Sequence, residues 1–341
     1  MSESNFYHVT ETGKLIRLAS WAKALTAARR GGYAWLDYCE PTKEELSLLM
    51  KPLKLHPLAI EDCTDEQQIP KIDNYQHHSF MLLNAINYAD HKLSIYEIDL
   101  FVGPNFVISV QQRGVDGQPL LKGVERTIEQ HPESMGKGPA YLLHTIMDQI
   151  VDQKFVEIEK LEDEMVEAEE EVLKDANDFN PATLLHLRRD LLTVRKSLYY
   201  EREILVKISR KDCPYIDETA LYRYRDIYDH LSKFFEMTES YRDVVTSLME
   251  MYLSMLNNEM ARAANTTNFR VRRLTLITAI FMPLSLLAGI GGMSEYTTMT
   301  GGPQNMWFSY PLFMFGMIII GFFTYRLLQW LERRQSRSEQ E

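Results

Sequence analysis

The sequence has almost no charge between Leu274 and Tyr325, where Glu295 is the one charged residue. Cysteine is also scarce, with three widely spaced residues and no C-x-x-C pair, so a zinc ribbon or a redox motif lacks support. The signatures H-E-x-x-H, G-x-x-x-x-G-K-S/T and G-x-S-x-G are absent, and we therefore expect neither an enzyme nor a nucleotide-binding protein. Acidic residues outnumber basic ones by 48 to 37, which argues against nucleic acid as a partner, because phosphate binding depends on Lys and Arg.

The acidic excess gives a formal net charge of -11, which suits a protein that meets cations. It is densest in the segment 157–171, which holds nine acids and one lysine. These acids are either the solvated face of a helix or a reservoir that concentrates cations. The sequence leaves both interpretations open.

Two apolar segments are long enough to cross a bilayer. Leu274–Met293 is uncharged over 20 residues, which as a helix spans roughly 30 Å, the thickness of a hydrocarbon core. Phe308–Tyr325 is uncharged as well, and aromatic residues typical of the membrane interface lie at Trp307, Tyr310 and Trp330. Two such runs are rare in soluble cores, so we predict a membrane hairpin rather than a buried one.

Basic residues indicate the orientation of this hairpin. Arginines precede the first span and follow the second, whereas the connecting loop 294–306 contains no Lys or Arg. The positive-inside rule then places both termini in the cytoplasm. We expect a multi-pass protein of the inner, or plasma, membrane of the cell.

The rest of the chain changes character near residue 140. Alternating aromatic and β-branched residues predict strands upstream of that point, at 33–37, 80–88, 95–102 and 106–110. Thr42 and Glu45 have the spacing of a helix capping box. Downstream, apolar residues recur at helical spacing, and no proline interrupts the chain from Asp217 to Pro283, which predicts a stalk helix that continues into the first span.

These patterns define the expected fold class and organisation. The fold is an α+β cytoplasmic domain followed by a long stalk helix and a two-helix transmembrane hairpin. The expected segments are 1–140 (α/β domain), 141–216 (helical hairpin), 217–273 (stalk helix), 274–293 (first transmembrane helix), 294–306 (external loop), 307–330 (second transmembrane helix) and 331–341 (basic tail).

Several runs of residues resemble one known family. The C-terminal run LTLITAIFMPL at 274–284, followed by Gly292-Met293-Ser294, resembles the CorA-type magnesium channels, as do HPLAIED at 56–62, QIPKID at 68–73 and YRDIYDH at 224–230. The resemblance covers nearly the whole chain. It implies a funnel-shaped homopentamer in which five copies of the first membrane helix line a pore.

The family carries Gly-Met-Asn at the outer end of this helix, whereas this chain has Ser294 in place of the asparagine. From the residues alone, Gly291-Gly292 is equally well a simple helix end. The resemblance favours a selectivity filter formed by Gly292, Met293 and Ser294. Glu295 would then form an outer acidic ring, or else be an ordinary loop acid.

Helical spacing from Gly292 predicts the pore lining. A further departure is that the stretch 252–274 is longer than the family pattern by about one heptad, which preserves the facing of the helix. If the helix lines no pore, the hydroxyls of Thr278 and Ser285 would donate hydrogen bonds to backbone carbonyls of their own helix, and Met282 would pack in an apolar core. The predicted lining residues are Asn268, Val271, Leu274, Thr278, Met282, Ser285 and Gly289.

The resemblance also implies an intracellular magnesium sensor made of carboxylates at subunit interfaces. Asp226 in the YRDIYDH run matches such a position, and Asp116 in the loop after the last expected strand is a second match. Facing carboxylates repel one another unless a cation lies between them, so loss of the cation would loosen a closed funnel. The alternative for both is a plain surface acid.

The leading hypothesis is a magnesium channel gated by intracellular cation, with Mg²⁺ both transported and regulatory. Co²⁺, Ni²⁺ and Zn²⁺ are further candidate ions. A zinc or other transition-metal transporter of the ZntB branch, with or without proton coupling, is the alternative, although no histidine or cysteine falls in the pore segment. A non-conducting cation sensor is the third hypothesis. The expected partners are further copies of the chain and the lipid bilayer.

Overall fold

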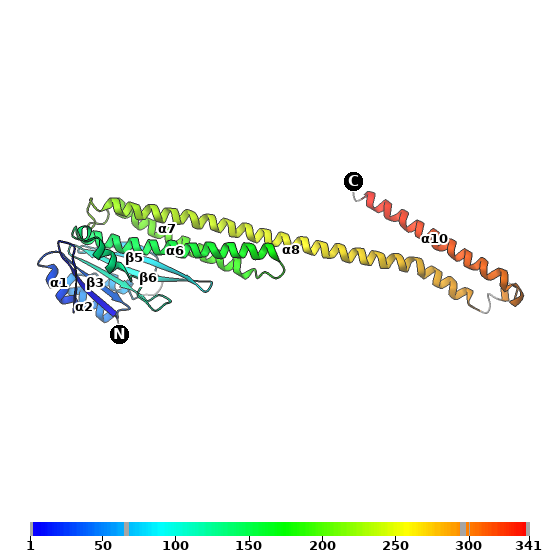
Figure 1. Ribbon diagram of the computed structural model, residues 1–341, viewed down its shortest axis with the longest axis horizontal. Coiled ribbons are helices and arrows are strands. Elements are labelled where there is room, and N and C mark those ends of the chain that lie inside the picture. Colours follow the sequence, from blue (N-terminus) through cyan, green and yellow to red (C-terminus); the bar gives the residue numbers. More distant parts are fainter. Residues whose placement is uncertain (1–2, 65–67, 294–297, 300, 339–341) are drawn as a thin grey trace. The chain divides into compact units, whose positions relative to one another are not determined.

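The computed structural model describes residues 3–64, 68–293, 298, 299 and 301–338 (Figure 1). The chain forms two compact units, residues 1–252 and 253–341. Helix α8, Leu221–Gly291, begins in the first unit and continues without a break into the second.

The first unit is built on a seven-stranded sheet in the order β2-β1-β3-β7-β6-β5-β4. Neighbouring strands are antiparallel except β3 and β7, which are parallel. The four expected strands are confirmed as β3, β5, β6 and β7, whereas three shorter or more polar strands were not expected. The strand bounds are β1 Glu3–Val9, β2 Leu15–Leu18, β3 Tyr33–Cys39, β4 Lys71–Asn74, β5 Ser79–Ala89, β6 Lys92–Gly103 and β7 Phe106–Gln111.

Three short helices cover one face of the sheet: α1 Trp21–Ala28, α2 Lys43–Leu53 and α3 Pro57–Asp62. The predicted capping box is confirmed at the start of α2. The Glu45 amide donates to the Thr42 hydroxyl at 3.2 Å, and the Thr42 amide donates to the Glu45 carboxylate at 3.0 Å. The box satisfies two amides that have no partner within the helix.

Long helices cover the other face of the sheet (Figure 1). Phe155 of α6 stacks on Phe234 of α8 at 5.4 Å between ring centroids, which joins these two helices through an apolar contact. Tyr241 of α8 donates to the Glu162 carboxylate of α6 at 2.5 Å. The helix bounds are α4 Val124–Gln130, α5 Pro132–Met135, α6 Pro139–Lys174 and α7 Ala182–Ser209.

Helix α8 begins four residues later than the expected stalk. The Asp217 carboxylate accepts the Ala220 amide at 3.1 Å, so residues 217–220 form a turn before the helix. The mechanism is the usual preference of aspartate for bonding to nearby backbone amides instead of continuing a helix.

The second unit contains the end of α8, the short 3₁₀ helix η1 Pro303–Asn305 and helix α10 Met306–Ser338. Among the residues described, α8 and α10 are the two helices long and apolar enough to cross a membrane. They approach closely at two glycines. A Cβ added to Gly291 would lie 2.6 Å from the ring of Phe313, and one added to Gly321 would lie 3.4 Å from Leu284. Gly291 is thus required by the contact between the two helices.

Candidate ion pathway and cation site

The membrane portion of α8 has two faces. One face is partly buried at near-helical spacing and includes Leu284 and Gly291, which contact α10. All the predicted lining residues are exposed in the single chain and lie about half a helical turn away, at 100° per residue. We call this exposed set the pore face: Asn268, Val271, Leu274, Thr278, Met282, Ser285 and Gly289.

The pore face mixes polar and apolar groups. Met282 is 72% exposed and Leu274 is 65% exposed. The Thr278 hydroxyl donates to the Leu274 carbonyl at 3.0 Å, so the expected back-bonding occurs, and the threonine oxygen keeps lone pairs for a further donor. Thr278 and Ser285, which lie within the predicted span, would place polar atoms in lipid if this face were not covered by protein or water.

The predicted filter lies where α8 ends. The Gly292 amide donates to the Ala288 carbonyl at 3.0 Å, and the Met293 amide donates to the Ile290 carbonyl at 3.2 Å, which forms a turn after the helix. Ser294 and Glu295 lie outside the described residues. The roles of Gly292, Met293, Ser294 and Glu295 in selectivity therefore stay predictions.

The two predicted sensor carboxylates lie in different places within one subunit. Asp116 is in the loop after β7, where its carboxylate accepts the Gln118 amide at 2.9 Å, and it borders a hollow together with Glu157 of α6. Asp226 is exposed on α8, near Asp148 of α6. Glu157 and Asp148 are on opposite faces of α6, so a single subunit does not bring Asp116 and Asp226 together.

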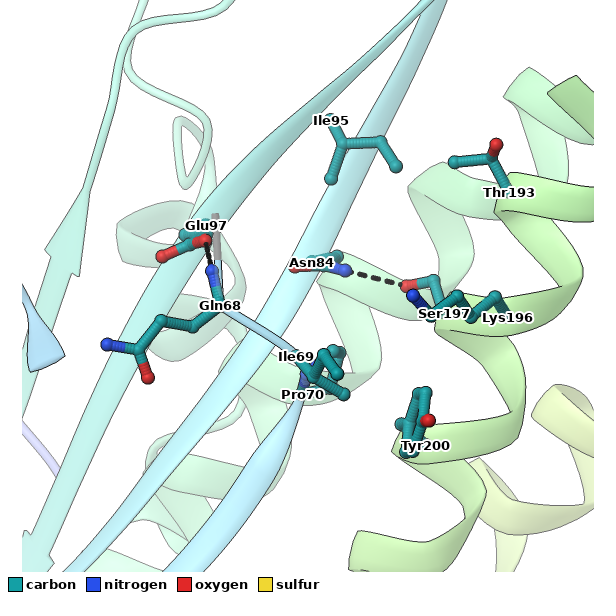
Figure 2. A pocket seen from close by; sticks show the side chains of 10 residues that line it. All are labelled: Gln68, Ile69, Pro70, Asn84, Ile95, Glu97, Thr193, Lys196, Ser197 and Tyr200. Atoms are coloured by element: carbon teal, nitrogen blue, oxygen red, sulfur yellow. Dashed lines mark hydrogen bonds between the residues drawn. The ribbon is translucent and has the colours of Figure 1, made fainter. Parts of the chain in front are cut away.

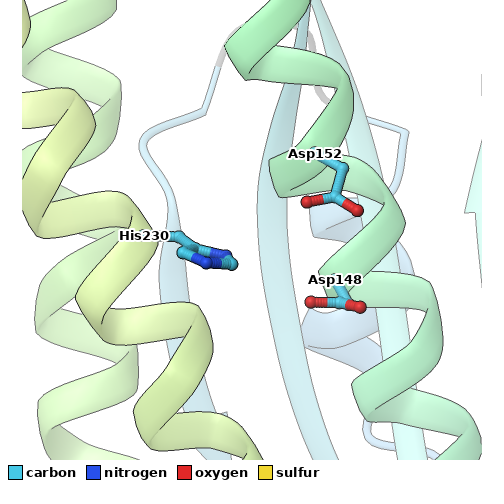
Figure 3. A group of neighbouring side chains, drawn as sticks. All are labelled: Asp148, Asp152 and His230. Atoms are coloured by element: carbon cyan, nitrogen blue, oxygen red, sulfur yellow. The ribbon is translucent and has the colours of Figure 1, made fainter.

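A group of three metal-binding side chains, which we call the α6–α8 cluster, lies where these two helices face each other. Figure 3 shows Asp148 and Asp152 on α6 directed toward His230 on α8. One ligand atom from each residue lies within 4.8 Å of those of the other two. The aspartates are four residues apart, which places them on one face of the helix.

Electrostatics at the cluster favour a cation. Burial raises the pKa of the Asp148 carboxyl, and the nearby Asp226 carboxylate raises it further. Burial and then Asp148 raise the pKa of Asp152, whereas His230 opposes both shifts. Each raised pKa means that the negative charge is poorly compensated by the protein itself, and a bound cation would compensate it.

Asp226 was predicted from the sequence as a sensor carboxylate, but the cluster beside it was not. The available signal was the pair Asp148 and Asp152 at i, i+4 in a helix, combined with His230 in the same run of residues as Asp226. That signal was weak, because α6 and α8 are far apart along the chain and their pairing is not encoded locally.

A hollow of about 410 Å³ between β5, β6 and α7 does not resemble a cation site (Figure 2). Asn84 donates to the Ser197 hydroxyl at 2.9 Å across it. Glu97 is the one carboxylate among the described lining residues, and it already accepts the Gln68 amide. The lining is a mixture of apolar and neutral polar groups with Lys196 at the edge. No second anionic ligand is found in the part of this lining that the structure describes.

Comparison with known proteins agrees with this architecture. Residues 30–333 match the model of the family described as CorA-like Mg2+ transporter protein. The chain is 33% identical over 260 residues to YfjQ of Bacillus subtilis (strain 168), covering 76% of this chain and 78% of that protein. It is 32% identical over 271 residues to the cobalt/magnesium transport protein CorA of Thermotoga maritima, covering 78% and 73%.

Two further likenesses are weaker in sequence. The solved structure of the CorA magnesium transporter from Methanocaldococcus jannaschii superposes with a TM-score of 0.69 at 22% identity, covering 96% of this chain and 97% of that one, which shows the same fold. The zinc transport protein ZntB of Yersinia pseudotuberculosis is 21% identical over 321 residues, covering 91% and 89%. The family match extends over most of the chain, from the sheet to the second membrane helix, and the chain therefore belongs to the CorA-like Mg²⁺ transporter family.

Proposed function

We propose that this chain conducts Mg²⁺ across a membrane through a pore on the axis of a homopentamer. The observation that carries the proposal is the pore face: its polar residues Asn268, Thr278 and Ser285 lie on the side of α8 that α10 leaves uncovered. Five copies facing an axis would give Thr278 and Ser285, the two that lie within the span, water and ions instead of lipid. The pentamer is the assembly that the resemblance to this family implies.

Neutral oxygens suit the passage of magnesium. Mg²⁺ loses its octahedral waters reluctantly, so a pore can bind the hydrated ion through hydrogen-bond acceptors on its wall. Thr278 and Ser285 supply hydroxyls, and Gly292 and Ser294 would supply carbonyl and hydroxyl oxygens at the outer end. Apolar rings of Met282 and Leu274 would close the pathway by excluding water.

Regulation by intracellular cation is the finer part of the proposal. The α6–α8 cluster and Asp226 form an uncompensated anionic site in the unit that we assign to the cytoplasm. A bound Mg²⁺ would hold α8 against α6, and its loss would let the carboxylates repel one another. Because α8 continues to Gly291, such a change acts on the same helix that carries the pore face. Asp116 would contribute from a neighbouring subunit.

The zinc alternative is less well supported. ZntB is a more distant relative than the CorA proteins, and the pore face offers no imidazole or thiolate to a soft ion. Members of the family are transporters, which is the class proposed for this chain. We place it in the inner, or plasma, membrane as a multi-pass protein with both termini in the cytoplasm, in agreement with the arginines that flank the two spans.

Reconstitution tests the proposal. The full chain is placed in liposomes that contain a magnesium indicator, an inside-negative potential is applied, and the entry of Mg²⁺, Co²⁺, Ni²⁺ and Zn²⁺ is compared. We expect rapid Mg²⁺ entry, lost in Ser285→Phe on the pore face and retained in Ile277→Phe, an exposed residue that lies outside the pore face at 100° per residue. Vesicles that stay impermeable to all four ions would refute conduction and favour the non-conducting sensor. Equal flux in both variants would refute the pore face.

A further inference from the structure

The two membrane helices contact each other along one stripe of each helix. Leu284, Leu287 and Gly291 of α8 are partly buried and recur at intervals of three and four residues, and Phe313 and Gly321 of α10 are partly buried as well. At one point of the contact, a Cβ added to Gly321 would lie 3.4 Å from Leu284, which is an ordinary approach between carbon atoms. At the other point the sizes are exchanged, because α10 provides the ring of Phe313 and α8 provides Gly291.

The ring of Phe313 fills the space that a side chain at position 291 would need. A Cβ added to Gly291 would lie 2.6 Å from the Cζ atom of the ring and 2.8 Å from its Cε1 atom. Non-bonded carbon atoms pack at about 3.5–4.0 Å, so the distal edge of the ring rests on the backbone of α8. Because a phenyl ring is rigid and offers a large contact area, it sets the separation of the two helices at this point.

Gly291 and Gly292 face different sides of α8. The Gly292 amide donates to the Ala288 carbonyl at 3.0 Å, so the helical path continues through this residue. Gly291 lies seven residues, or about two turns, after Leu284 and is therefore on the side of α10. Gly292 lies seven residues after Ser285 and is therefore on the side of the pore face.

One peptide unit thus separates the contact with α10 from the pore side of the helix. The unit between Gly291 and Gly292 is planar and rigid, so a displacement of Gly291 is passed on to Gly292. Binding of a hydrated ion depends on where the acceptors of the wall lie, and a functional site tolerates displacements of only about 0.5 Å. Phe313 can therefore influence the pathway without touching the ion.

We propose that Phe313 is a positioning residue for the outer end of the pore. Its ring, which rests on Gly291, fixes the place of Gly292 and thereby the preference of the pore among divalent ions. Phe313 is half-buried on α10, a helix that provides none of the pore face. The inference rests on the proposed function, because it assigns selectivity to that pore, and it adds to the pathway a residue of the second membrane helix.

An exchange of volume between the two positions tests the proposal. Phe313→Leu removes the ring edge from the helix contact, and Gly291→Ala adds the methyl group for which the ring leaves no room. Each change alone should displace the end of α8. In the double variant the methyl group enters the space that the ring vacates, and exchanges that conserve volume are the best tolerated. Gly316→Ala is the matched control, because a Cβ added at this glycine of α10 would meet no described atom within 4 Å.

Two measurements follow the exchange in the full chain. The first is the ratio of Mg²⁺ to Co²⁺ entry into liposomes, which we expect to change several-fold in each single variant and to return toward the native value in the double variant. The second needs no conduction. Met293→Cys is added to each protein, and the rate at which a thiol reagent modifies it in detergent is compared, since the native cysteines are buried or half-buried. We expect this rate to change several-fold in both single variants and to recover in the double variant.

The outcomes distinguish this proposal from the proposed function. If the liposomes conduct but neither single variant changes the ion ratio, Phe313 has no part in selectivity and the inference is overturned. A double variant that does not recover, or a change of the same size in Gly316→Ala, would overturn it too, because the effect would then come from general damage to the helix pair.

Failure of conduction has a separate signature. If the native chain conducts no ion, the proposed function fails, while the modification rates still decide whether Phe313 positions the end of α8. Altered rates in the single variants with recovery in the double variant would support the positioning role, and native rates in both single variants would overturn it.

Discussion

A ring nitrogen of His230 on α8 and a carboxylate oxygen of Asp148 on α6 lie within 4.8 Å of each other, and Asp152 is equally close to both (Figure 3). The helix that carries His230 is the same one that reaches the membrane hairpin. An ion bound here would touch a packing helix of the first unit and the proposed pore helix at once.

Removing one carboxylate from the α6–α8 cluster should weaken the response to magnesium. The measurement is the Mg²⁺ concentration that gives half of the maximal protection against limited proteolysis. We expect Asp148→Asn and Asp152→Asn each to raise this concentration by about tenfold, which corresponds to a loss of about 1.4 kcal/mol in binding free energy. Asp163→Asn, an exposed acid on α6 outside the cluster, is the control and should leave the midpoint in place. If the midpoint moves equally in all three variants, the loss of any negative charge on α6 explains the effect, and the cluster has no specific role.

A fixed positive charge at Asp226 should replace the regulatory cation. In Asp226→Lys, the ammonium would lie near the Asp148 and Asp152 carboxylates, on which Asp226 acts in the native chain. We expect the assembly to stay closed without magnesium, measured as a low current in Mg²⁺-free solution. Asp229→Lys, exposed and three residues further along α8, is the matched control. An unchanged magnesium dependence of the current in Asp226→Lys would rule out this role.

The regulatory response should weaken in acid. The pKa values of Asp148 and Asp152 are raised, so these carboxyls take up protons at a higher pH than ordinary aspartates and then compete with the cation. We expect the Mg²⁺ midpoint to rise between about pH 7 and about pH 5.

The metal-free protein provides the reciprocal check on this pH effect. The folded state binds these protons more tightly than the unfolded state, so without divalent cations the contribution of the two aspartates to stability should increase as pH falls through their raised pKa values. Melting temperatures of the native chain and of Asp148→Asn, recorded across this range, measure it. If the two proteins show the same pH dependence, Asp148 does not titrate in the predicted direction.

The sequence predicted the membrane hairpin well because its signal is local. Absence of charge and helical period are properties of one segment. The predicted pore lining needed more, because its helical spacing was counted from Gly292, the position that the family resemblance supplied. The capping box at Thr42 is similarly local. Strand β1 was missed although Tyr7 and Val9 are buried and their neighbours are more exposed, because this alternation is short and includes polar residues.

The long-range contacts between acids and histidines could not be predicted in the same way. Asp148 meets His230, and His91 lies near Glu164, only after separate elements pack together. A single sequence contains no record of which faces of α6, α7 and α8 meet. The acids of 157–171 therefore differ in their surroundings. Glu164 is buried and lines a hollow, whereas Asp163 is exposed to solvent. The helical period alone does not say which acid acquires a partner.

Ser294 should influence the choice of ion at the outer end of the proposed pore. The asparagine side chain is longer than that of serine and carries a carbonyl acceptor. Ser294→Asn should therefore narrow the outer ring and strengthen its hydrogen bonds to the hydration shell of the Mg²⁺ ion. We expect the ratio of Mg²⁺ to Co²⁺ flux in liposomes to increase by several-fold. Ser294→Ala serves as the control, and a ratio that is the same in all three proteins would remove residue 294 from selectivity.

Lys154 of α6 and Glu201 of α7 form an ion pair in which the side chains are 1% and 0% exposed. The Glu201 carboxylate also accepts a hydrogen bond from the backbone amide of Asn84 on β5 at 3.0 Å, so the ion pair joins the sheet to both helices. Burial lowers the pKa of Lys154, and Glu201 opposes this shift. Lys154→Met should leave a buried, uncompensated carboxylate and destabilise the first unit by about 3–5 kcal/mol.

Adding Glu201→Gln to this variant should recover part of the loss, because the buried charge is removed, although the new side-chain NH₂ group has no acceptor where the lysine stood. The methionine fills the volume of the lysine stem, and the glutamine oxygen still accepts the Asn84 amide, so neither a charge nor a backbone donor remains unpaired. Thermal unfolding followed by tryptophan fluorescence should therefore rank the double variant between the native chain and Lys154→Met. If the double variant unfolds at the same temperature as Lys154→Met or below it, the loss of stability in Lys154→Met comes from lost packing and not from the unpaired charge of Glu201.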